Sequence, residues 1–467
     1  MIGKQFKGFN TYFILLTILV LVAASTWLIP GAEYGTTTVE GREVVDPDTF
    51  RYIDSSQPQG LAAVAMAPIR GFVDAALIVG FVLIVGGAFG VFQRTKAIDS
   101  GVLALARAHK VSHLVRLLTI PIFMLLFSLG GAVFGMSEEV IPFILIFVPL
   151  AMILGYDSIT GIAIPFIGAG AGFAGAFLNP FTIGVAQGIA DIPLFSGISY
   201  RLVCWLVVTG VSIAYVMVYA ARVKAHPEKS RMRAEDSEKR RNLDTDQLQD
   251  FDGMTGKDKL VLYTFATGMA ILIFGVLRYQ WYIEEIAAVF LVTGLAVGIV
   301  SRLSVADISD AFIKGAKDLV GTALLIALAR GILVIARDGQ IIATILHSLS
   351  AAVGSFHPVV SSQMMFLVQT VLNFFVPSGS GQAALTMPIM APLADLVGVT
   401  RQTAVLAFQF GDGFSNLIIP TSGVLMGVLT LGGVPWEKWV RWVLPLEGLY
   451  LLVGLLLLVP PYFMNWF

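Results

Sequence analysis

The residues that decide the fold are NFFVPSGSGQAALTMPIMAPLADLVG, Asn373–Gly398. They belong to an apolar segment, 358–397, that is about twice as long as one helical membrane span, and PSGSGQ at Pro377–Gln382 interrupts it in the middle. Proline, glycine and serine at this point leave backbone polar groups without helical partners, and hydrocarbon does not solvate such groups. We therefore expect a helical hairpin over 358–397 whose tip faces protein or a watery cavity.

A second hairpin of the same kind is predicted at 114–154, where GMSEE at Gly135–Glu139 interrupts the apolar residues. The two hairpins share a register, because PLAMILGYD at Pro149 and PLADLVGVT at Pro392 differ in number by 392 minus 149, or 243. Further aligned pairs are Arg94 and Arg337, Ser137 and Ser380, Gly155 and Gly398, and, at an offset of 241, Gly170 and Gly411. The chain is therefore predicted to contain an internal repeat.

The composition is typical of a membrane protein: 57% of the residues are hydrophobic, 13% are charged, and the mean hydropathy is +0.83. The formal net charge of -1 shows no basic excess, so we expect no nucleic-acid partner. The hydrophobic composition instead indicates a lipid bilayer as the surroundings. The predicted spans outside the hairpins are Thr11–Ile29, Val73–Phe92, Ser158–Ala190, Tyr200–Ala221, Leu260–Val276, Ile283–Val300, Leu319–Ile335, Gln402–Leu431 and Trp439–Val459. The expected fold is an all-α polytopic membrane protein.

Loop charge divides the chain into two repeats and a linker. Seven Lys and Arg residues occur from Lys224 to Arg241, both included, and the positive-inside rule places such a segment in the cytoplasm. We expect a charged, solvated linker at 223–259 between a first repeat, 1–222, and a second repeat, 260–467. The amino terminus is then cytoplasmic. By the loop charges, the first hairpin is expected to enter the membrane from the cytoplasm and the second from outside, so the repeats are predicted to be inverted.

Residues that are small or polar gather at both hairpin tips. The second tip holds five of them: Ser378, Gly379, Ser380, Gly381 and Gln382. The first tip holds three: Ser137, Glu138 and Glu139. A serine-capped turn, and carboxylates that only complement a helix N-terminus, would explain the tips without a ligand. Because matching tips occur in both repeats, we expect them to bind substrate near the middle of the membrane.

Each predicted span that follows a hairpin is broken at a proline, so broken helices are expected at 158–190 and 402–431. A failed helical ladder exposes oxygen atoms that can coordinate a cation, although hydroxyl groups can also heal a proline kink. The candidates for binding a coupling sodium ion or proton are Asn179, Thr182, Asp412, Asn416 and Thr421. Candidates for substrate binding at the same breaks are Asn179, Thr421 and Ser422.

Asp412 and Arg330 are ionisable residues inside predicted spans, where charge is costly and usually functional. Asp412 stands ten residues after Gln402, and the repeat places the neutral Ala171 opposite it. Arg330 has Gly87 as its counterpart, and we expect it to form an ion pair with an acid, for function or for structure alone. Counting these two residues with the two tip glutamates, the interior has three acids and one base. It therefore has acid to spare for a proton, a sodium ion or a substrate ammonium group.

Four stretches, MSEEVIPF, GAGFAGAFLNPFTIGVAQ, NFFVPSGSGQAALTMPIMAPLADLVG and RQTAVLAFQFGDGFSNLIIPTSG, resemble the YfcC family of bacterial inner-membrane carriers. That family is similar to the DcuC-type dicarboxylate carriers and belongs with the ion transporter superfamily. The resemblance implies a homodimeric elevator transporter, in which a transport domain with both hairpins and both broken helices moves against a fixed scaffold.

The resemblance also bears on the substrate, a small polar metabolite. Related carriers bind carboxylates with Ser-Asn-Thr signatures at the tips, whereas this chain has Ser137-Glu138-Glu139 and Ser378-Gly379-Ser380. Members of the YfcC family are labelled basic amino acid antiporters, and two glutamates suit an ammonium or guanidinium group. We expect an amino-acid-like or peptide substrate, with a four-carbon dicarboxylate as the alternative.

Other classes of membrane protein fit less well, so we expect neither an enzyme nor a cofactor. An intramembrane aspartyl protease requires glycine where this chain has Gln409, and Asp157 lies at a predicted boundary. A serine protease built on Ser380 lacks a histidine on a later span. A channel needs a ring of repeated selectivity elements, whereas the two tips differ. No metal ion beyond sodium is expected.

Overall fold

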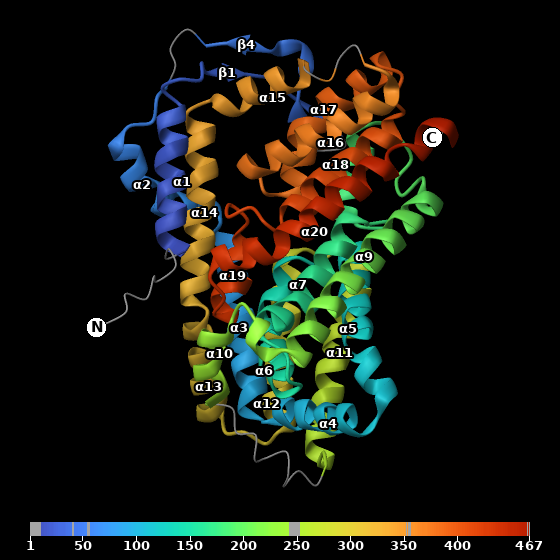
Figure 1. The fold of residues 1–467 in the computed structure, drawn as a ribbon. Coiled ribbons are helices and arrows are strands. Elements are labelled where there is room, and N and C mark those ends of the chain that lie inside the picture. The colour runs from blue at the N-terminus through green and yellow to red at the C-terminus, as the bar shows by residue number, and fades with distance from the viewer. Residues whose placement is uncertain are drawn as a thin grey trace, which may run out of the picture.

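The computed structural model describes residues 11–39, 42–53, 57–241, 253–351, 353, 356–464 and 466, and most of them are helical (Figure 1). Within these ranges, eight helical segments are long and apolar enough to cross a membrane. They are α3 (Ala76–Arg94), α5 (His113–Phe134), α9 (Ile198–Ala225), α11 (Gly256–Tyr279), α12 (Ile283–Val300), α14 (Val320–Asp338), α16 (Pro358–Phe375) and Trp436–Met464, which contains α20 (Trp436–Leu457) and α21 (Pro460–Met464). The prediction of an all-α polytopic membrane protein is confirmed.

The helices of both predicted hairpins are interrupted where the sequence indicates. α5 is followed by a 3-10 turn, η2 (Glu138–Phe143), and then by α6 (Ile144–Ile153). α16 ends at Phe375, and α17 (Gly379–Leu396) begins within the PSGSGQ run. Because α5 and α16 are each long enough to cross a membrane, the re-entrant character of the hairpins stays a prediction.

The two predicted broken spans each consist of two helices. In the first, α7 (Ser158–Ala174) is separated from α8 (Val185–Ile189) by a π-helical turn, η3 (Pro180–Gly184). In the second, α18 (Arg401–Ser415) is separated from α19 (Gly423–Gly432) by residues 416–422. The prolines therefore interrupt the helical ladder in both, as their missing N–H groups require.

Helix bounds recur along the chain at an offset of 244 residues. The offset relates α2 (Leu61–Asp74) to α13 (Val305–Asp318), relates α3 to α14, and relates the start of α4 (Ala97–Val111) to that of α15 (Ile341–Ala351). Helices α2, α4, α13 and α15 were not predicted from the sequence, because they are too short or too polar to resemble membrane spans. The related pairs cross in space, since α2 packs on α14 and α3 packs on α13.

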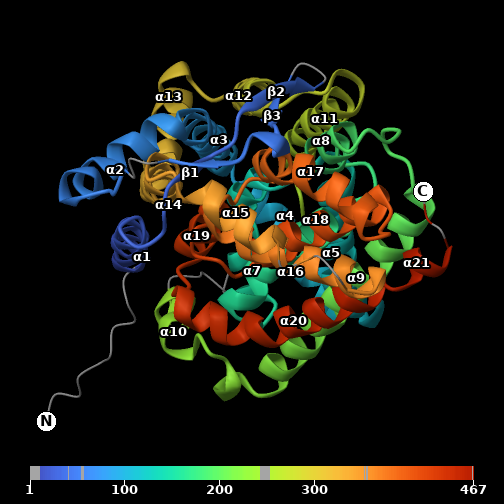
Figure 2. The ribbon, with the colours of Figure 1, turned by 90° about the horizontal axis from the view of Figure 1, so that it is seen from above.

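The helices form two groups that lie side by side (Figures 1 and 2). One group contains α1 (Thr11–Ser25), α2, α3, α12, α13 and α14, and the other contains α5, α7, α9, α16, α18 and α20. The groups touch where α19 packs on α14 and where η2 packs on α3. The residues that follow the first tip and those that follow the second broken span therefore lie at the junction between the groups.

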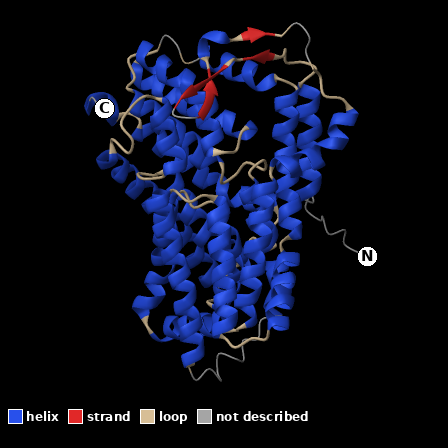
Figure 3. Ribbon diagram, turned by 180° about the vertical axis from the view of Figure 1, so that it is seen from behind, coloured by secondary structure: helices blue, strands red, loops and turns tan. Residues whose placement is uncertain are grey.

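Two short antiparallel strand pairs lie at one end of the molecule (Figure 3). β1 (Ala32–Glu33) pairs with β4 (Arg51–Tyr52), with Ala32 opposite Tyr52. β2 (Thr36–Val39) pairs with β3 (Arg42–Val45), with Thr36 opposite Val45. A 3-10 turn, η1 (Pro47–Thr49), follows β3. These elements lie between α1 and α2.

Part of the linker is docked on the membrane helices, which corrects the expectation of a solvated linker at 223–259. In α10 (Arg233–Arg241), the Asp236 carboxylate accepts a 2.8 Å hydrogen bond from the Ser158 N–H at the start of α7. Lys239 Nζ donates to Gly432 O at 2.7 Å, and Arg240 Nη1 donates to Met152 O at 3.2 Å. An acid at a helix N-terminus and bases at helix C-termini complement the helix dipoles, which explains the docking. Residues 242–252 of the predicted linker lie outside the described ranges.

Glycines bring α5 and α7 into backbone contact. A Cβ atom added at Gly172 would lie 1.8 Å from Ser128 O, and one added at Gly131 would lie 2.1 Å from Ala169 O. Such close approach lets the two backbones pack without side chains between them, as small residues commonly do in membranes. The position of the first tip depends on this contact, because α5 ends two turns after Ser128.

We predict that Gly172→Ala lowers the stability of the purified protein by about 1–3 kcal/mol, because the added methyl group overlaps a backbone carbonyl. The matched control is Gly448→Ala, also within a helix, where an added Cβ meets nothing within 4 Å. Thermal unfolding in detergent would be followed for both variants. Equal unfolding temperatures for the two variants would show that the α5–α7 contact is not as tight as described.

Candidate functional site

The first tip is a turn that directs glutamates toward the junction of the helix groups. α5 ends at Gly135, whose φ of 72° suits glycine, and Ser137 precedes η2. Glu139 is buried, and its Oε2 accepts a 2.9 Å hydrogen bond from the Ser137 N–H. Glu139 therefore closes the turn, while Glu138, on the same turn, is only half-buried and lines a cavity.

The second tip is the N-terminus of α17. Ser378 is its N-cap residue, and its hydroxyl accepts a 3.4 Å hydrogen bond from the Gly381 N–H. Gln382 lies behind the tip, fully buried, and its Nε2 donates to Gln369 O at 2.9 Å and to Gln369 Oε1 at 2.7 Å. This bond fastens the start of α17 to α16 and gives the tip a rigid support.

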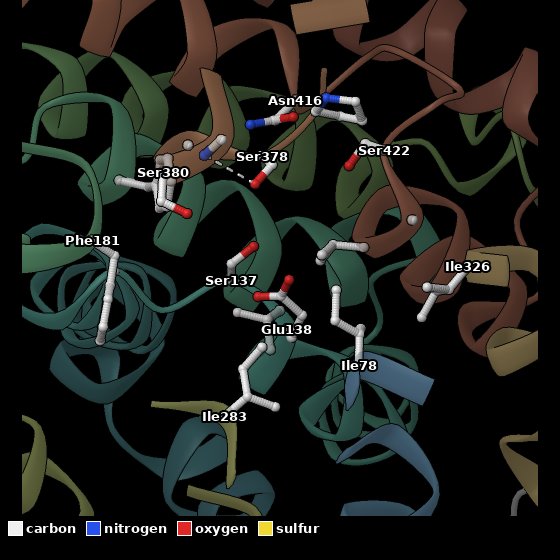
Figure 4. Close-up of a pocket in the computed structure, with 18 of the residues that line it drawn as sticks. Ile78, Ser137, Glu138, Phe181, Ile283, Ile326, Ser378, Ser380, Asn416 and Ser422 are labelled. Carbon is white, nitrogen blue, oxygen red and sulfur yellow. Dashed lines mark hydrogen bonds between the residues drawn. The ribbon is translucent and has the colours of Figure 1, made fainter. Parts of the chain in front are cut away.

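The two tips face each other across one cavity of about 470 Å³ (Figure 4). Ser137 and Glu138 lie on one side, and Ser378 and Ser380 lie on the other. The predicted site residues that line it are Ser137, Glu138, Glu139, Thr182, Arg330, Ser378, Gly379, Ser380, Gly381, Asn416, Thr421 and Ser422. Both tips and both helix breaks thus contribute to one site, although they lie in two distant parts of the sequence.

Asn179, Gln382 and Asp412 were also predicted and do not line this cavity. Asn179 is fully buried, and its Oδ1 accepts hydrogen bonds from the Phe181 N–H at 2.9 Å and the Thr182 N–H at 3.3 Å. It caps the broken helix and also supports the first tip, because a Cβ at Gly135 would lie 2.7 Å from Asn179 Oδ1. Its amide nitrogen Nδ2 is buried without a hydrogen-bond partner.

Asp412 lies fully buried just beneath the second tip. Its Oδ1 accepts a 3.2 Å hydrogen bond from Asn416 Nδ2, and its Oδ2 is buried without a partner. A Cβ at Gly379 would lie 3.1 Å from Asp412 Oδ2 and 2.4 Å from Thr182 Cγ2, so these side chains meet at this glycine. The hydroxyls of Thr182 and Thr421 are likewise buried without partners. A carboxylate oxygen and hydroxyl oxygens that have no hydrogen-bond partner can coordinate a hard cation such as sodium. The carboxylate can alternatively bind a proton.

Asn373 holds this group of residues in place. Its Nδ2 donates to Asp412 O at 3.1 Å, to Ser415 Oγ at 2.8 Å and to Asn416 Oδ1 at 3.0 Å. These bonds join the end of α16 to the break after α18. Sequence reasoning missed Asn373, although a buried amide inside the apolar stretch VLNFF was a usable signal.

Arg330 forms the expected ion pair, and its partner is Asp74 at the end of α2. Arg337 Nη1 contacts the other oxygen of Asp74 at 3.1 Å. Asp74 and Tyr282 both line the cavity, and neither was predicted. Asp74 lies next to the start of a predicted span, where a carboxylate looks like a boundary residue, and its partners are 256 and 263 positions away. The ion pair between Asp74 and Arg330 can be identified only once α2 is known to cross α14.

The profile of the DcuC family, described as "C4-dicarboxylate anaerobic carrier", matches residues 10–462. The chain belongs to the DcuC family. Members of the DcuC family are membrane carriers, so the chain is a multi-pass secondary transporter and not an enzyme. The resemblance identified from the sequence motifs is confirmed.

Two relatives cover nearly the whole chain. The Escherichia coli protein named "Putative basic amino acid antiporter YfcC" is 38% identical over 95% of this chain and 94% of its own length. An uncharacterized protein from Haemophilus influenzae is 30% identical over 98% of both chains. The DcuC family resemblance therefore extends through both tips and both breaks.

Two solved transporter structures have more distant similarity. The YdaH transporter of Alcanivorax borkumensis has a TM-score of 0.47 and 16% identity, with 98% of this chain and 99% of that chain covered. MtrF of Neisseria gonorrhoeae, whose structure is described as illuminating a class of antimetabolite efflux pumps, has a TM-score of 0.42 and 16% identity, with 96% and 94% covered.

We predict that Asp74→Asn lowers stability by about 1–3 kcal/mol, because it leaves the partly buried Arg330 guanidinium without its carboxylate. The exchanged pair, Asp74→Arg with Arg330→Asp, should recover part of the loss. The control is Asp338→Asn, which removes the more exposed ion pair with Arg70 and should change stability by less than about 1 kcal/mol. Thermal unfolding of the purified carrier measures all three. Equal losses from Asp74→Asn and Asp338→Asn would contradict a special role for the Arg330 pair.

Proposed function

We propose that this carrier moves a small amino-acid-like or peptide metabolite across the bacterial inner membrane, as an ion-coupled transporter or antiporter. The observation that supports this most is the charge of the cavity between the tips. Among the described residues that line it are three carboxylates, Asp74, Glu138 and Glu139, and an arginine, Arg330, which is paired with Asp74. A substrate with a cationic group would balance the remaining acid.

The names of the relatives point to two substrates, and the cavity favours one of them. The DcuC family description names C4-dicarboxylates, whereas the name of the Escherichia coli relative refers to basic amino acids. A dicarboxylate carries two negative charges into a site that already has an acid excess, which is unfavourable at low dielectric. A four-carbon dicarboxylate remains the second candidate, because the family description names that class.

The two tips offer complementary groups for the two ends of an amino acid. The Glu138 carboxylate suits the ammonium or guanidinium group. In the first turn of α17, the Gly381 and Gln382 N–H groups bond to Ser378, which leaves the Gly379 and Ser380 N–H groups for a substrate carboxylate. The small side chains of this turn let a ligand approach these donors closely.

An inverted repeat and an elevator mechanism are part of the proposal. The helix offset of 244 residues, the crossing pairs and the two helix groups support it. The group with both tips would be the moving transport domain, and the group with α1, α2 and α14 would be the scaffold and the site of dimer formation. The end with α10 would face the cytoplasm, because the basic linker residues lie there.

The coupling ion is proposed to bind beneath the second tip. Asp412, Thr182 and Thr421 offer buried oxygens without partners, and Asn179 and Asn416 flank them. A Cβ added at Gly379 would meet both Asp412 and Thr182, so Gly379 packs close to them, and an ion held there would hold the tip that binds the substrate carboxylate. Ion and substrate would then stabilise the same position of the second tip. Each would therefore raise the affinity for the other, which is a coupling free energy between two adjacent sites.

The direct test is transport in liposomes. The purified carrier would be given radiolabelled arginine, lysine, ornithine, short peptides, succinate and fumarate, with sodium and proton gradients imposed separately. We expect saturable uptake of an amino acid or peptide that exchanges against internal substrate. In Glu138→Gln the uptake should fall by about tenfold or more, because this variant removes the negative charge that pairs with the substrate's cationic group. Glu139→Gln should lose less, because Glu139 closes its own turn.

Three results would contradict this proposal. Dicarboxylate uptake that survives Glu138→Gln would make the four-carbon dicarboxylate the substrate. Flux that neither saturates nor exchanges would indicate a channel. Equal loss in the two glutamate variants would mean that the tip glutamates stabilise the turn only.

A second prediction concerns the coupling ion. Gly379→Ala should raise the ion concentration for half-maximal uptake by about tenfold or more, because the added methyl group overlaps Thr182 and contacts Asp412. The matched control is Gly184→Ala in the first broken helix, where an added Cβ meets nothing closer than 3.7 Å. The dependence of uptake rate on sodium and on pH would be measured for both. An unchanged ion dependence in Gly379→Ala would place the coupling ion elsewhere.

A further inference from the structure

A second cavity, of about 360 Å³, lies away from the tips on the outer surface of the helix bundle. It is formed by the first turns of α5, the last turns of α9 and Tyr156, which precedes α7. Its wall contains apolar side chains of α5 and α9, among them Leu117, Ile120 and Met217. Its mouth carries His113, Arg116 and Lys224. We call it the α5–α9 groove.

The charge of the α5–α9 groove is basic and is not compensated by an acid. Lys224 Nζ lies 2.9 Å from His109 Nε2 and 4.8 Å from the centre of the Tyr156 ring. Arg116 donates through Nη2 to Lys110 O at 3.1 Å and through Nε to His109 O at 3.4 Å. Within the described ranges, no ion pair joins Arg116 or Lys224 to a carboxylate.

His109, in α4, shows how close these two charges are. Burial and the positive charges of Lys224 and Arg116 lower the pKa of His109 to about 4. The imidazole is therefore neutral near pH 7, and its Nε2 accepts the hydrogen bond from Lys224. Arg116 and Lys224 are thus both held at the mouth of the groove by neutral groups, the backbone carbonyls and the His109 imidazole. Their positive charge is therefore available to an anion.

The α5–α9 groove lies at the level where a bilayer changes from hydrocarbon to headgroups. Both α5 and α9 are candidate membrane spans, and the groove is at the first residues of α5 and the last residues of α9. Leu117, in the wall beside the basic mouth, is 49% exposed, so part of that wall is uncovered apolar surface. The N-terminus of α5, capped by Ser112, adds its partial positive charge at the same level.

We propose that the α5–α9 groove binds an anionic phospholipid, with the phosphate of its headgroup between Arg116 and Lys224 and an acyl chain along Leu117, Ile120 and Met217. Basic pockets between membrane helices at headgroup depth bind lipid phosphates through charge, and the adjoining apolar wall supplies the hydrophobic part. A free phosphate would use only the basic mouth, whereas a lipid uses the mouth and the wall together. The bound lipid would cover the surface where α5 meets α9, beside the helix that carries the first tip.

The test uses the full-length carrier in phosphatidylcholine nanodiscs that contain a phosphatidylglycerol with a photoactivatable acyl chain. After irradiation, the labelled peptides are identified by mass spectrometry. We expect label on α5 and α9 in the unmodified protein. In Arg116→Gln with Lys224→Gln the label should fall by about tenfold or more, because two basic residues at the headgroup level are lost. Ala221→Trp, which keeps both charges and fills the groove, should reduce the label in the same way.

The matched control is Lys257→Gln with Lys259→Gln, which removes the same charge from exposed positions at the start of α11 and should leave the label unchanged. Label that persists in both groove variants would overturn the proposal. So would equal labelling by a phosphatidylcholine probe, which lacks the net negative charge. Loss of labelling when millimolar glycerol 3-phosphate is present before and during irradiation would show instead that the groove binds soluble phosphates.

Discussion

The structure depends on one constraint, which is that hydrocarbon offers no hydrogen bonds to a broken backbone. Among the described residues, two interruptions lie between the helices of the hairpins and two lie in the spans that follow them. Each is surrounded by protein groups that replace the missing partners. Asn179 caps the first broken helix, Ser378 and Gln382 secure the start of α17, and Asn373 joins α16 to the break after α18. Because all four must avoid lipid, they gather around the interior cavity, and that gathering creates the site.

The charges of the site follow from the same constraint. A carboxylate in such an environment needs a partner, a proton or an ion. Asp74 has Arg330 and Arg337, and Glu139 has the backbone of its own turn. Asp412 keeps one oxygen without a partner, and Glu138 faces the cavity. Of the acids that surround the tips, the two whose environment is incomplete are the two to which the proposed function assigns ligands.

The sequence predicts well those features that depend on local chemistry. The interruptions at Gly135–Glu139 and Pro377–Gln382 were predictable because proline, glycine and serine disrupt a helix wherever the chain goes. The pairing of Asp74 with Arg330 was not predictable, because it depends on how α2 crosses α14. The docking of α10 was missed for a related reason, since a charged segment looks solvated until the helix ends that it complements are located.

The crossed packing of α2 and α3 with α14 and α13 also bears on biosynthesis. Gly71 lies against the backbone of Ala327 and Gly331, and Gly90 lies against Ala311 and Gly315, so the first half is complete only when the second half covers it. More than 200 residues separate the end of α3 from the start of α13. At a synthesis rate of about 5–20 residues per second, the ribosome needs roughly 10–40 s to make them. During that interval the small-residue faces of α2 and α3 stand in the membrane without their partners, and insertion machinery or lipid must shield them.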